Sequence, residues 1–246
     1  MLICVDIGNT KISVGVMEED KKLYGFSFPT IKDAPKEYFY KELKAGLKDK
    51  CECLICSVCP EVNDNITNAF AKLGINAKVI DPLRLEHMLK IGLKNKKDLG
   101  SDIFVGCLAS VDSDNDSSIV VDMGTATTLA LTYKGVMLGG AICPGVKTSY
   151  KNLFSTASLL SEVSFDIPST AIGYDTPSSV CSGMMYGTIG SVDRIISEMR
   201  KSYKVKKIVF TGGMGRFFAP HFKGAVYEED LIFIGLVKIN NYIKGR

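Results

Sequence analysis

Two short segments of the chain combine an aspartate, a glycine and hydroxyl or lysine side chains in a pattern typical of phosphate-binding turns. They are Asp6-Ile7-Gly8-Asn9-Thr10-Lys11 and Asp122-Met123-Gly124-Thr125, and each follows an apolar run. Glycine lets backbone amides approach phosphate oxygens, and an aspartate at a strand end can hold Mg²⁺ directly or through water. One such motif is usually an ordinary hairpin, but two copies in matching contexts favour binding of a nucleotide's phosphates.

Asp102 is the predicted catalytic base. It stands at the start of an expected helix, where an aspartate could equally serve only to begin that helix. Transfer of a γ-phosphoryl group to an alcohol requires a carboxylate that accepts the proton of the hydroxyl. The sequence therefore favours a small-molecule kinase with Asp102 in this role.

A glycine-rich turn, Thr211-Gly212-Gly213, follows another apolar run and suits the adenosine part of a nucleotide. The signal is weak by itself and gains weight from its position after the two phosphate motifs. The Walker pattern and Gly-x-Gly-x-x-Gly are both absent from the sequence, which disfavours P-loop and Rossmann proteins.

The expected secondary structure places these motifs at the ends of strands. The chain opens in the order βββαβαβ, and a three-strand theme returns from residue 118, which indicates an internal duplication. We predict an α/β protein of two duplicated domains, residues 1–100 and 101–246, with an interdomain cleft. Strands are predicted at 2–6, 11–17, 22–28, 53–58, 77–80, 118–123, 127–133, 135–142 and 207–211, and helices at about 35–49, 61–73, 101–112, 145–160, 177–201 and 230–243.

Four cysteines, Cys51, Cys53, Cys56 and Cys59, are close enough in sequence to raise the question of a zinc site. Zinc sites usually pair two cysteines in a tight turn with a distant second pair, whereas residues 53–59 have the apolar character of a buried strand. We therefore predict a strand here and no metal.

The composition is that of an ordinary folded protein, with 46% hydrophobic and 23% charged residues among 246. A net charge of +3 on interleaved charges predicts neither a nucleic-acid partner nor a basic membrane patch. No apolar run approaches the roughly 20 residues that cross a bilayer, and the apolar N-terminus lacks a basic leader. We therefore expect a cytoplasmic protein.

Further segments occur in the order found in a known family: Ser57–Pro60, Gly139–Gly145, Thr156-Ala157, Asp175-Thr176 and Ser182-Gly183. Together with the motifs above, they make nearly the whole chain resemble the acetate and sugar kinase, Hsp70 and actin superfamily, and within it the type III pantothenate kinases. The resemblance implies two actin-like (ribonuclease H-like) domains. It also implies phosphorylation of the primary hydroxyl of pantothenate by ATP, the first step towards coenzyme A, with a monovalent cation (K⁺ or NH₄⁺) and a homodimer, and the ATP would be bound with Mg²⁺ as the phosphate motifs already suggest.

The resemblance assigns roles to individual positions. Asp122 would hold the monovalent cation and Asp102 would accept the proton, while Asp6 is a candidate magnesium ligand from its own position at the end of a strand. The ATP-binding residues would be Asp6, Ile7, Gly8, Asn9, Thr10, Lys11, Ile12, Ser13 and Thr125. The substrate pocket would use Gly100, Ser101, Asp102, Ile103 and Thr176, the last near the dimer interface.

The chain departs from the family pattern at three places. Ile103 stands where the family usually has an arginine, Lys94 where an aromatic residue is common, and Leu159-Leu160 where a Leu-Pro pair is usual. Ile103 cannot pair with the pantothenate carboxylate, and Lys94 or Lys147 could supply the cation instead. Two alternatives stay open: a kinase of another small hydroxyl compound, or a non-catalytic nucleotide-binding regulator of the same fold.

Overall fold

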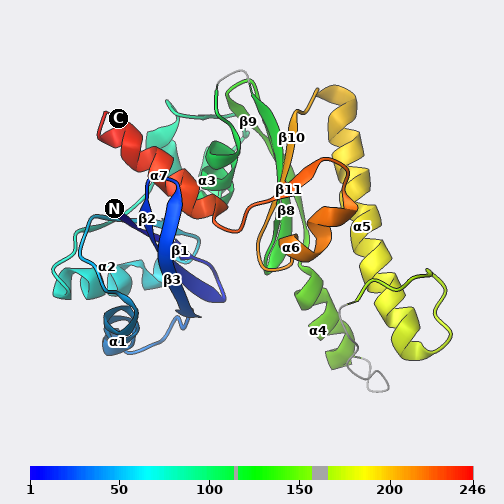
Figure 1. The fold of residues 1–246 in the computed structure, drawn as a ribbon, viewed down its shortest axis with the longest axis horizontal. Coiled ribbons are helices and arrows are strands. Elements are labelled where there is room, and N and C mark those ends of the chain that lie inside the picture. The colour runs from blue at the N-terminus through cyan, green and yellow to red at the C-terminus, as the bar shows by residue number, and fades with distance from the viewer. Residues whose placement is uncertain (114–115, 157–165, 246) are drawn as a thin grey trace. The chain divides into compact units, whose positions relative to one another are not determined.

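The computed structural model describes residues 1–113, 116–156 and 166–245. The chain forms two compact units, shown in Figure 1: unit 1 comprises Met1–Asp114, Gly135–Met137 and Asp230–Arg246, and unit 2 comprises Asn115–Lys134 and Leu138–Glu229. The domain division after residue 100 stays a prediction. The boundaries of the two compact units lie elsewhere, because the helix that begins at Ser101 and the C-terminal helix both belong to unit 1.

Unit 1 is built on a five-stranded mixed sheet in the order β3-β2-β1-β4-β5. β1 pairs antiparallel with β2 and parallel with β4, and its first four residues are buried, as expected of a central strand. The elements are β1 (Leu2–Ile7), β2 (Lys11–Glu18), β3 (Lys21–Pro29), α1 (Lys36–Gly46), β4 (Cys53–Ser57), a 3₁₀ turn (Pro60–Val62), α2 (Asn63–Lys72), β5 (Ala77–Val79), a 3₁₀ turn (Pro82–Leu85), β6 (Lys90–Ile91), a 3₁₀ turn (Lys96–Asp98), α3 (Ser101–Ser110) and α7 (Leu231–Ile243).

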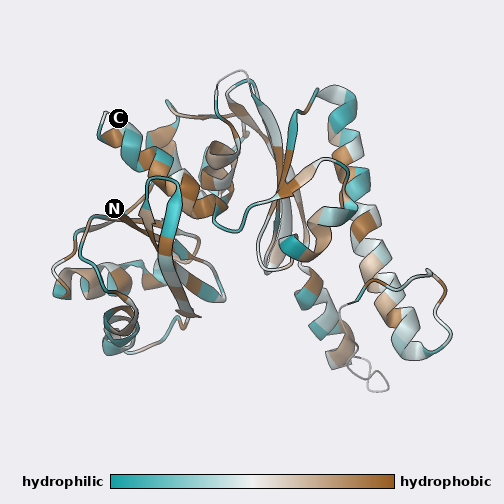
Figure 2. Ribbon diagram, viewed as in Figure 1, coloured by the Kyte–Doolittle hydropathy of each residue, from teal (hydrophilic) through white to brown (hydrophobic). Residues whose placement is uncertain are grey.

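Helices bury their apolar faces around this sheet. Phe39 of α1 and Phe70 of α2 are fully buried in one core cluster with the strand residues Ile3 and Ile55. The C-terminal helix α7, drawn in red in Figure 1, packs against α3 and β1, and Figure 2 shows brown hydrophobic segments along it. Gly235 of α7 is required at this contact, because a Cβ there would lie 2.6 Å from the carbonyl oxygen of Val105.

Unit 2 contains a sheet in the order β11-β10-β7-β8-β9, and β6 pairs with Val136 and Met137 at the start of β9. The long helix α5 begins with a capping box, in which the Asp175 side chain accepts a hydrogen bond from the Ser178 N–H. The elements are β7 (Ser117–Met123), β8 (Ala126–Tyr133), β9 (Val136–Pro144), α4 (Val146–Thr156), α5 (Thr176–Ser202), β10 (Lys207–Thr211), α6 (Gly215–Phe218), a 3₁₀ turn (Ala219–His221) and β11 (Ala225–Tyr227).

The strand orders of the two units confirm the predicted duplication. β3-β2-β1-β4-β5 in unit 1 corresponds strand by strand to β9-β8-β7-β10-β11 in unit 2. In each unit the central strand carries an aspartate near its end, and the following strand returns antiparallel. The register places Asp6 beside Cys56 of β4, and Asp122 beside Thr211 of β10.

Each strand and helix predicted from the sequence is present among the described residues, with its ends shifted by a few residues. The cysteine-rich segment forms strand β4 (Cys53–Ser57), as predicted. The helix predicted at 145–160 is α4, described to Thr156, and Leu159-Leu160 lies outside the described residues. The sequence did not reveal β6 and β11, which are two and three residues long and too short to show an alternating pattern. The equally short β5 was predicted because Asp81-Pro82 marks a turn directly after it.

Candidate active site

The first hairpin, residues 6–13 in unit 1, turns tightly around Gly8. The Gly8 N–H donates to the Lys11 carbonyl at 3.0 Å, and the Thr30 hydroxyl donates to the Gly8 carbonyl at 2.7 Å. A Cβ on Gly8 would lie 3.2 Å from the Lys11 carbonyl oxygen, so the turn leaves little room for a side chain. Residues 9–11 at the tip are exposed and can meet an anionic ligand.

The predicted ATP-binding residues of this hairpin differ in which of their atoms a ligand could reach. Ile7 and Ile12 are fully buried in the core, so only their backbones could take part in binding. Asp6 is half-buried at the end of β1, opposite Ser13 of β2, which is also half-buried. The hairpin therefore offers one carboxylate and several polar groups around a glycine turn.

Asp102 lies in the first turn of α3, in the same unit. Its Oδ1 accepts a hydrogen bond from the Ile103 N–H at 2.7 Å. Burial raises the pKa of the Asp102 carboxyl above its ordinary value, although hydrogen bonds from the backbone N–H groups of Asp102 and Ile103 act in the opposite direction. A Cβ on Gly100 would lie 2.5 Å from the Asp102 Oδ1, so the glycine leaves room for the carboxylate. A partly buried carboxylate with a raised pKa is suited to accept a proton.

The second hairpin, residues 122–128 in unit 2, repeats this geometry in a shorter form. The Gly124 N–H donates to the Ala126 carbonyl at 3.0 Å. Asp122 is half-buried opposite Thr128, while Gly124 and Thr125 at the tip are exposed. The hairpin presents a carboxylate and a threonine around an exposed glycine.

The glycine-rich turn after β10 packs directly on this second hairpin. Gly212 has a φ of +79°, a region that favours glycine, and a Cβ there would overlap the Asp122 Oδ1 and lie 2.8 Å from the Met123 backbone. The Met214 N–H donates to the Met123 carbonyl at 3.1 Å. The turn at residues 212–215 therefore supports Asp122 through backbone contacts.

The start of α4 supports the same hairpin from another segment. A Cβ on Gly145 would overlap the Thr125 carbonyl oxygen and lie 2.6 Å from that of Gly124. The Thr148 hydroxyl donates to the Thr125 carbonyl at 2.8 Å. Sequence reasoning assigned Gly145 only to a family motif, because nothing local in the sequence reveals which backbone it approaches.

The remaining predicted substrate residue, Thr176, is exposed as the first residue of α5 in unit 2. Hydrogen bonds from Ser178 to the N-cap residue Asp175 lower the pKa of that carboxyl. In unit 1, Ile103 is half-buried and Lys94 is exposed, and Lys147 is exposed on α4 in unit 2.

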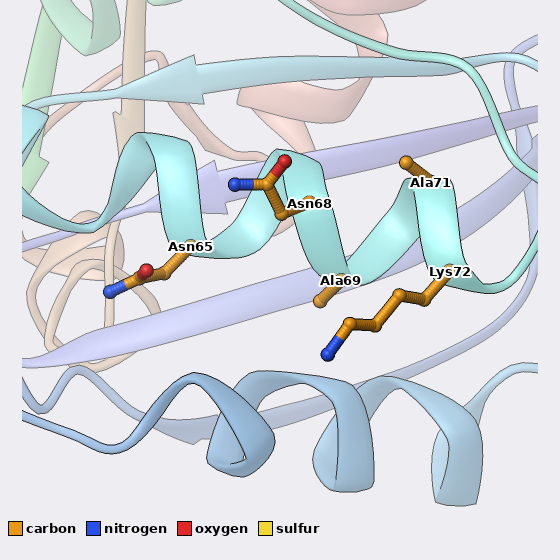
Figure 3. A pocket seen from close by; sticks show the side chains of 5 residues that line it. All are labelled: Asn65, Asn68, Ala69, Ala71 and Lys72. Atoms are coloured by element: carbon orange, nitrogen blue, oxygen red, sulfur yellow. The ribbon is translucent and has the colours of Figure 1, made fainter.

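A surface hollow in unit 1 is lined by residues of α2 that play no part in the predicted site (Figure 3). They are Asn65, Asn68, Ala69, Ala71 and Lys72. Across residues 1–113, 116–156 and 166–245, no three His, Cys, Asp or Glu side chains gather as a metal site would need. Within the same ranges, no helix has the length and apolar character to cross a membrane.

Solved structures with the same fold define the class of protein. A Campylobacter jejuni protein of the Baf family of transcriptional activators aligns with a TM-score of 0.64 at 23% identity, covering 99% of this chain and 100% of that one. A Sinorhizobium meliloti protein described as a 2-dehydro-3-deoxygalactonokinase gives a TM-score of 0.62 at 13% identity and covers 99% of both chains. MreB5 of Spiroplasma citri, solved with ADP, gives 0.54 at 9% identity over 100% of this chain and 98% of that one. The fold is therefore that of duplicated actin-like domains.

Sequence comparison identifies the family within that class. The type III pantothenate kinase family profile matches residues 2–198. A type III pantothenate kinase of Desulforapulum autotrophicum is 34% identical over 231 residues, which are 89% of this chain and 88% of the relative. The Agathobacter rectalis type III pantothenate kinase is 29% identical over 96% of this chain and 95% of its own. The chain belongs to the type III pantothenate kinase family.

Proposed function

We propose that this chain transfers the γ-phosphoryl group of ATP to the primary hydroxyl of pantothenate, giving 4'-phosphopantothenate in the first step of coenzyme A biosynthesis. Membership of the family supports the reaction, and the observation that carries the mechanism is the Asp102 carboxylate. It is partly buried in the first turn of α3, and its pKa is raised by that burial. Asp102 accepts the hydroxyl proton as the phosphoryl group transfers in line.

The two hairpins serve the phosphates of ATP in this proposal. Backbone amides and side chains of residues 8–11 contact phosphate oxygens in unit 1, and Thr125 does so in unit 2. The actin-like fold and the exposed glycine turns at both places support this assignment. The turn at residues 212–215 takes the adenosine part.

The acidic residues of the hairpins fit the cations that the reaction needs. Mg²⁺ is commonly held by one or two carboxylates together with substrate phosphates and water, so the single carboxylate of Asp6 suffices. When bound, the ion neutralises charge on the phosphates. Asp122 and the carbonyl oxygens of the second hairpin provide oxygen donors for K⁺ or NH₄⁺.

A lysine replaces the missing arginine as partner of the pantothenate carboxylate. Lys94 and Lys147 are the candidates, and both are exposed. We expect the KM for pantothenate to rise about tenfold in Lys94→Ala or Lys147→Ala, with Lys97→Ala as the matched surface control. Unchanged KM values in both variants would exclude this proposal.

The pantothenate kinase proposal is tested by coupled measurement of ATP consumption with a panel of alcohols. Turnover with pantothenate, and phosphopantothenate identified by mass spectrometry, is the expected result. Turnover only with an alcohol that lacks a carboxylate would instead support the reading in which Ile103 marks another substrate. ATP binding without turnover on any acceptor would support a regulator.

We also propose a cytoplasmic homodimer. The exposed side of α5 supports it, because a Cβ on Gly183, Gly187 or Gly190 would meet none of the described residues within 4 Å, and such small residues allow close approach of another backbone. Thr176 begins the same helix and would lie near that interface. Analytical ultracentrifugation tests the dimer, and a purely monomeric mass at assay concentrations would contradict it.

A further inference from the structure

We propose that Ser101 is a positioning residue, whose hydroxyl fastens the first turn of α3 to the end of β4 and thereby holds Asp102 in place. The proposal deepens the kinase function proposed above and rests on it. The family resemblance implied that Ser101 contacts the substrate directly, whereas in this proposal Ser101 acts through Asp102.

The side chain of Ser101 is buried, with 6% of the residue exposed. Its hydroxyl donates to the Ser57 carbonyl at 2.6 Å and accepts from the Ser57 N–H at 3.1 Å. The Cys56 thiol lies 3.4 Å from the same oxygen and is its third partner. A serine hydroxyl has one donor and two acceptor positions, so these three contacts use its full capacity. None is left for a substrate.

The position of Ser57 makes this contact important for the site. Ser57 ends β4 and lies beside Ile7 in the parallel pairing of β1 with β4. The next amide, that of Val58, donates to the Ile7 carbonyl at 3.0 Å, directly before the first hairpin. The Ser101 hydroxyl therefore joins the helix that carries Asp102 to the strand end beside the first hairpin.

Among the described residues, the other hydrogen bonds at the start of α3 are local to the helix. Gly100 is its N-cap residue and supplies no side-chain hydrogen bond. The Asp102 carboxylate accepts hydrogen bonds from the backbone N–H groups of Asp102 and Ile103, which lie in the same turn. Loss of the Ser101 hydroxyl would leave the Ser57 backbone without this partner and would allow the first turn of α3 to shift. A displacement of about 1 Å at a catalytic group can cost 10²-fold in rate.

Ser110 provides a matched control for a purely structural role. It lies at the other end of α3, is 5% exposed, and its hydroxyl donates to the Cys107 carbonyl at 2.8 Å within the same helix. Ser101→Ala and Ser110→Ala each remove one buried hydroxyl from one helix. Only the first removes the link to β4.

The experiment measures kcat, both KM values and unfolding free energy for wild type, Ser101→Ala, Ser101→Thr and Ser110→Ala. Ser101→Ala is expected to lower kcat about 10-fold to 10²-fold with the KM for ATP within about twofold, and Ser110→Ala to leave kcat unchanged. Ser101→Thr keeps the hydroxyl and should retain most of the turnover. Amide hydrogen exchange at Ser57 should accelerate in Ser101→Ala only.

Three results would overturn the proposal. The first is a wild-type kcat in Ser101→Ala, and the second is an equal loss of kcat in Ser101→Ala and Ser110→Ala. The third is a loss of kcat above tenfold in a folded Ser101→Thr, and this test can be made even if the alanine variant fails to fold. Absence of turnover in the wild type would count against the kinase proposal instead. The exchange rate at Ser57 would then still decide whether the hydroxyl holds the strand end.

Discussion

The two hairpins of the duplicated fold share a strand order and an acidic residue but are supported in different ways. In unit 1 the pairing of Asp6 with Ser13 leaves a turn one residue longer than that between Asp122 and Thr128 in unit 2. The first hairpin is held by the Thr30 hydroxyl. The second is also held by a hydroxyl, that of Thr148, and in addition by close backbone contacts from residues 145 and 212.

This difference indicates what the duplication has kept and what it has changed. The aspartate and the glycine turn recur because the sheet places them at the same strand end in each unit. The side-chain contacts differ: in unit 1 a serine links β4 to the helix of Asp102, whereas in unit 2 glycines pack on the hairpin. We therefore expect catalysis to depend on side chains of unit 1, and ATP binding to depend on backbone packing in unit 2.

The largest expected effect is a loss of turnover at Asp102 in unit 1 without a loss of ATP binding. Asp102→Asn should lower turnover about 10²-fold or more, because the amide cannot accept the hydroxyl proton. The Kd for ATP should stay nearly unchanged, as measured by calorimetry. Full turnover in the variant would remove Asp102 from its proposed role.

The same substitution should stabilise the fold at neutral pH. A stabilised variant excludes misfolding as the cause of lost turnover. Burial raises the pKa of Asp102 in the folded state, so its ionisation costs stability that builds up as the pH rises above the unfolded pKa and is complete above the folded pKa. The cost is absent below the unfolded pKa. Urea unfolding should therefore show Asp102→Asn as more stable than wild type at pH 7, with the difference vanishing near pH 3, whereas lower stability at pH 7 would contradict this.

Gly212→Ala tests the backbone support of the second hairpin. The new Cβ would overlap the Asp122 carboxylate at a positive φ, so we expect a loss of about 1–3 kcal/mol of unfolding free energy and weaker ATP binding. Gly213→Ala is the control, since its Cβ meets nothing within 4 Å and its φ is not positive. Equal effects of the two variants in urea unfolding would show that close packing on Asp122 is unimportant.

Lys238→Met tests the other end of the helix that carries Asp102. The Lys238 ammonium donates to the carbonyls of Ala109 and Val111 at 3.0 and 2.7 Å, at the C-terminus of α3. Its loss should destabilise the protein by about 1–2 kcal/mol in urea unfolding. Lys244→Met removes a surface ion pair with Glu52 and should cost less than about 0.5 kcal/mol. A smaller effect at Lys238 than at Lys244 would refute this account.

The smallest expected effect is a gain of stability within unit 2. The Thr132 hydroxyl on β8 is fully buried and has no hydrogen-bond partner among the residues that the structure describes. Thr132→Val preserves the shape and removes the polar group, so the free energy of unfolding should rise by about 0.5–1 kcal/mol. A loss of stability in thermal or urea unfolding would mean that the hydroxyl is satisfied in solution.

The sequence was sufficient for the longer strands and helices and for the duplication, because these follow from hydrophobic periodicity and from repeated Asp-x-Gly motifs. It could not show contacts that depend on tertiary packing. Nothing near Ser101 in the sequence indicates that its hydroxyl bonds to Ser57, and nothing near Lys238 indicates that it caps α3. Two statements stay predictions: that both hairpins contact one triphosphate, and that the individual site residues have the roles assigned to them.

The pH dependence of kcat in wild type and Asp102→Asn tests the central claim most directly, namely that Asp102 accepts the substrate proton. Because burial raises the pKa of this carboxyl, the wild-type rate should fall with unit slope as the pH drops through a value above the ordinary 3.8. The residual activity of Asp102→Asn should lack this acidic limb. An identical acidic limb in both proteins would contradict the claim.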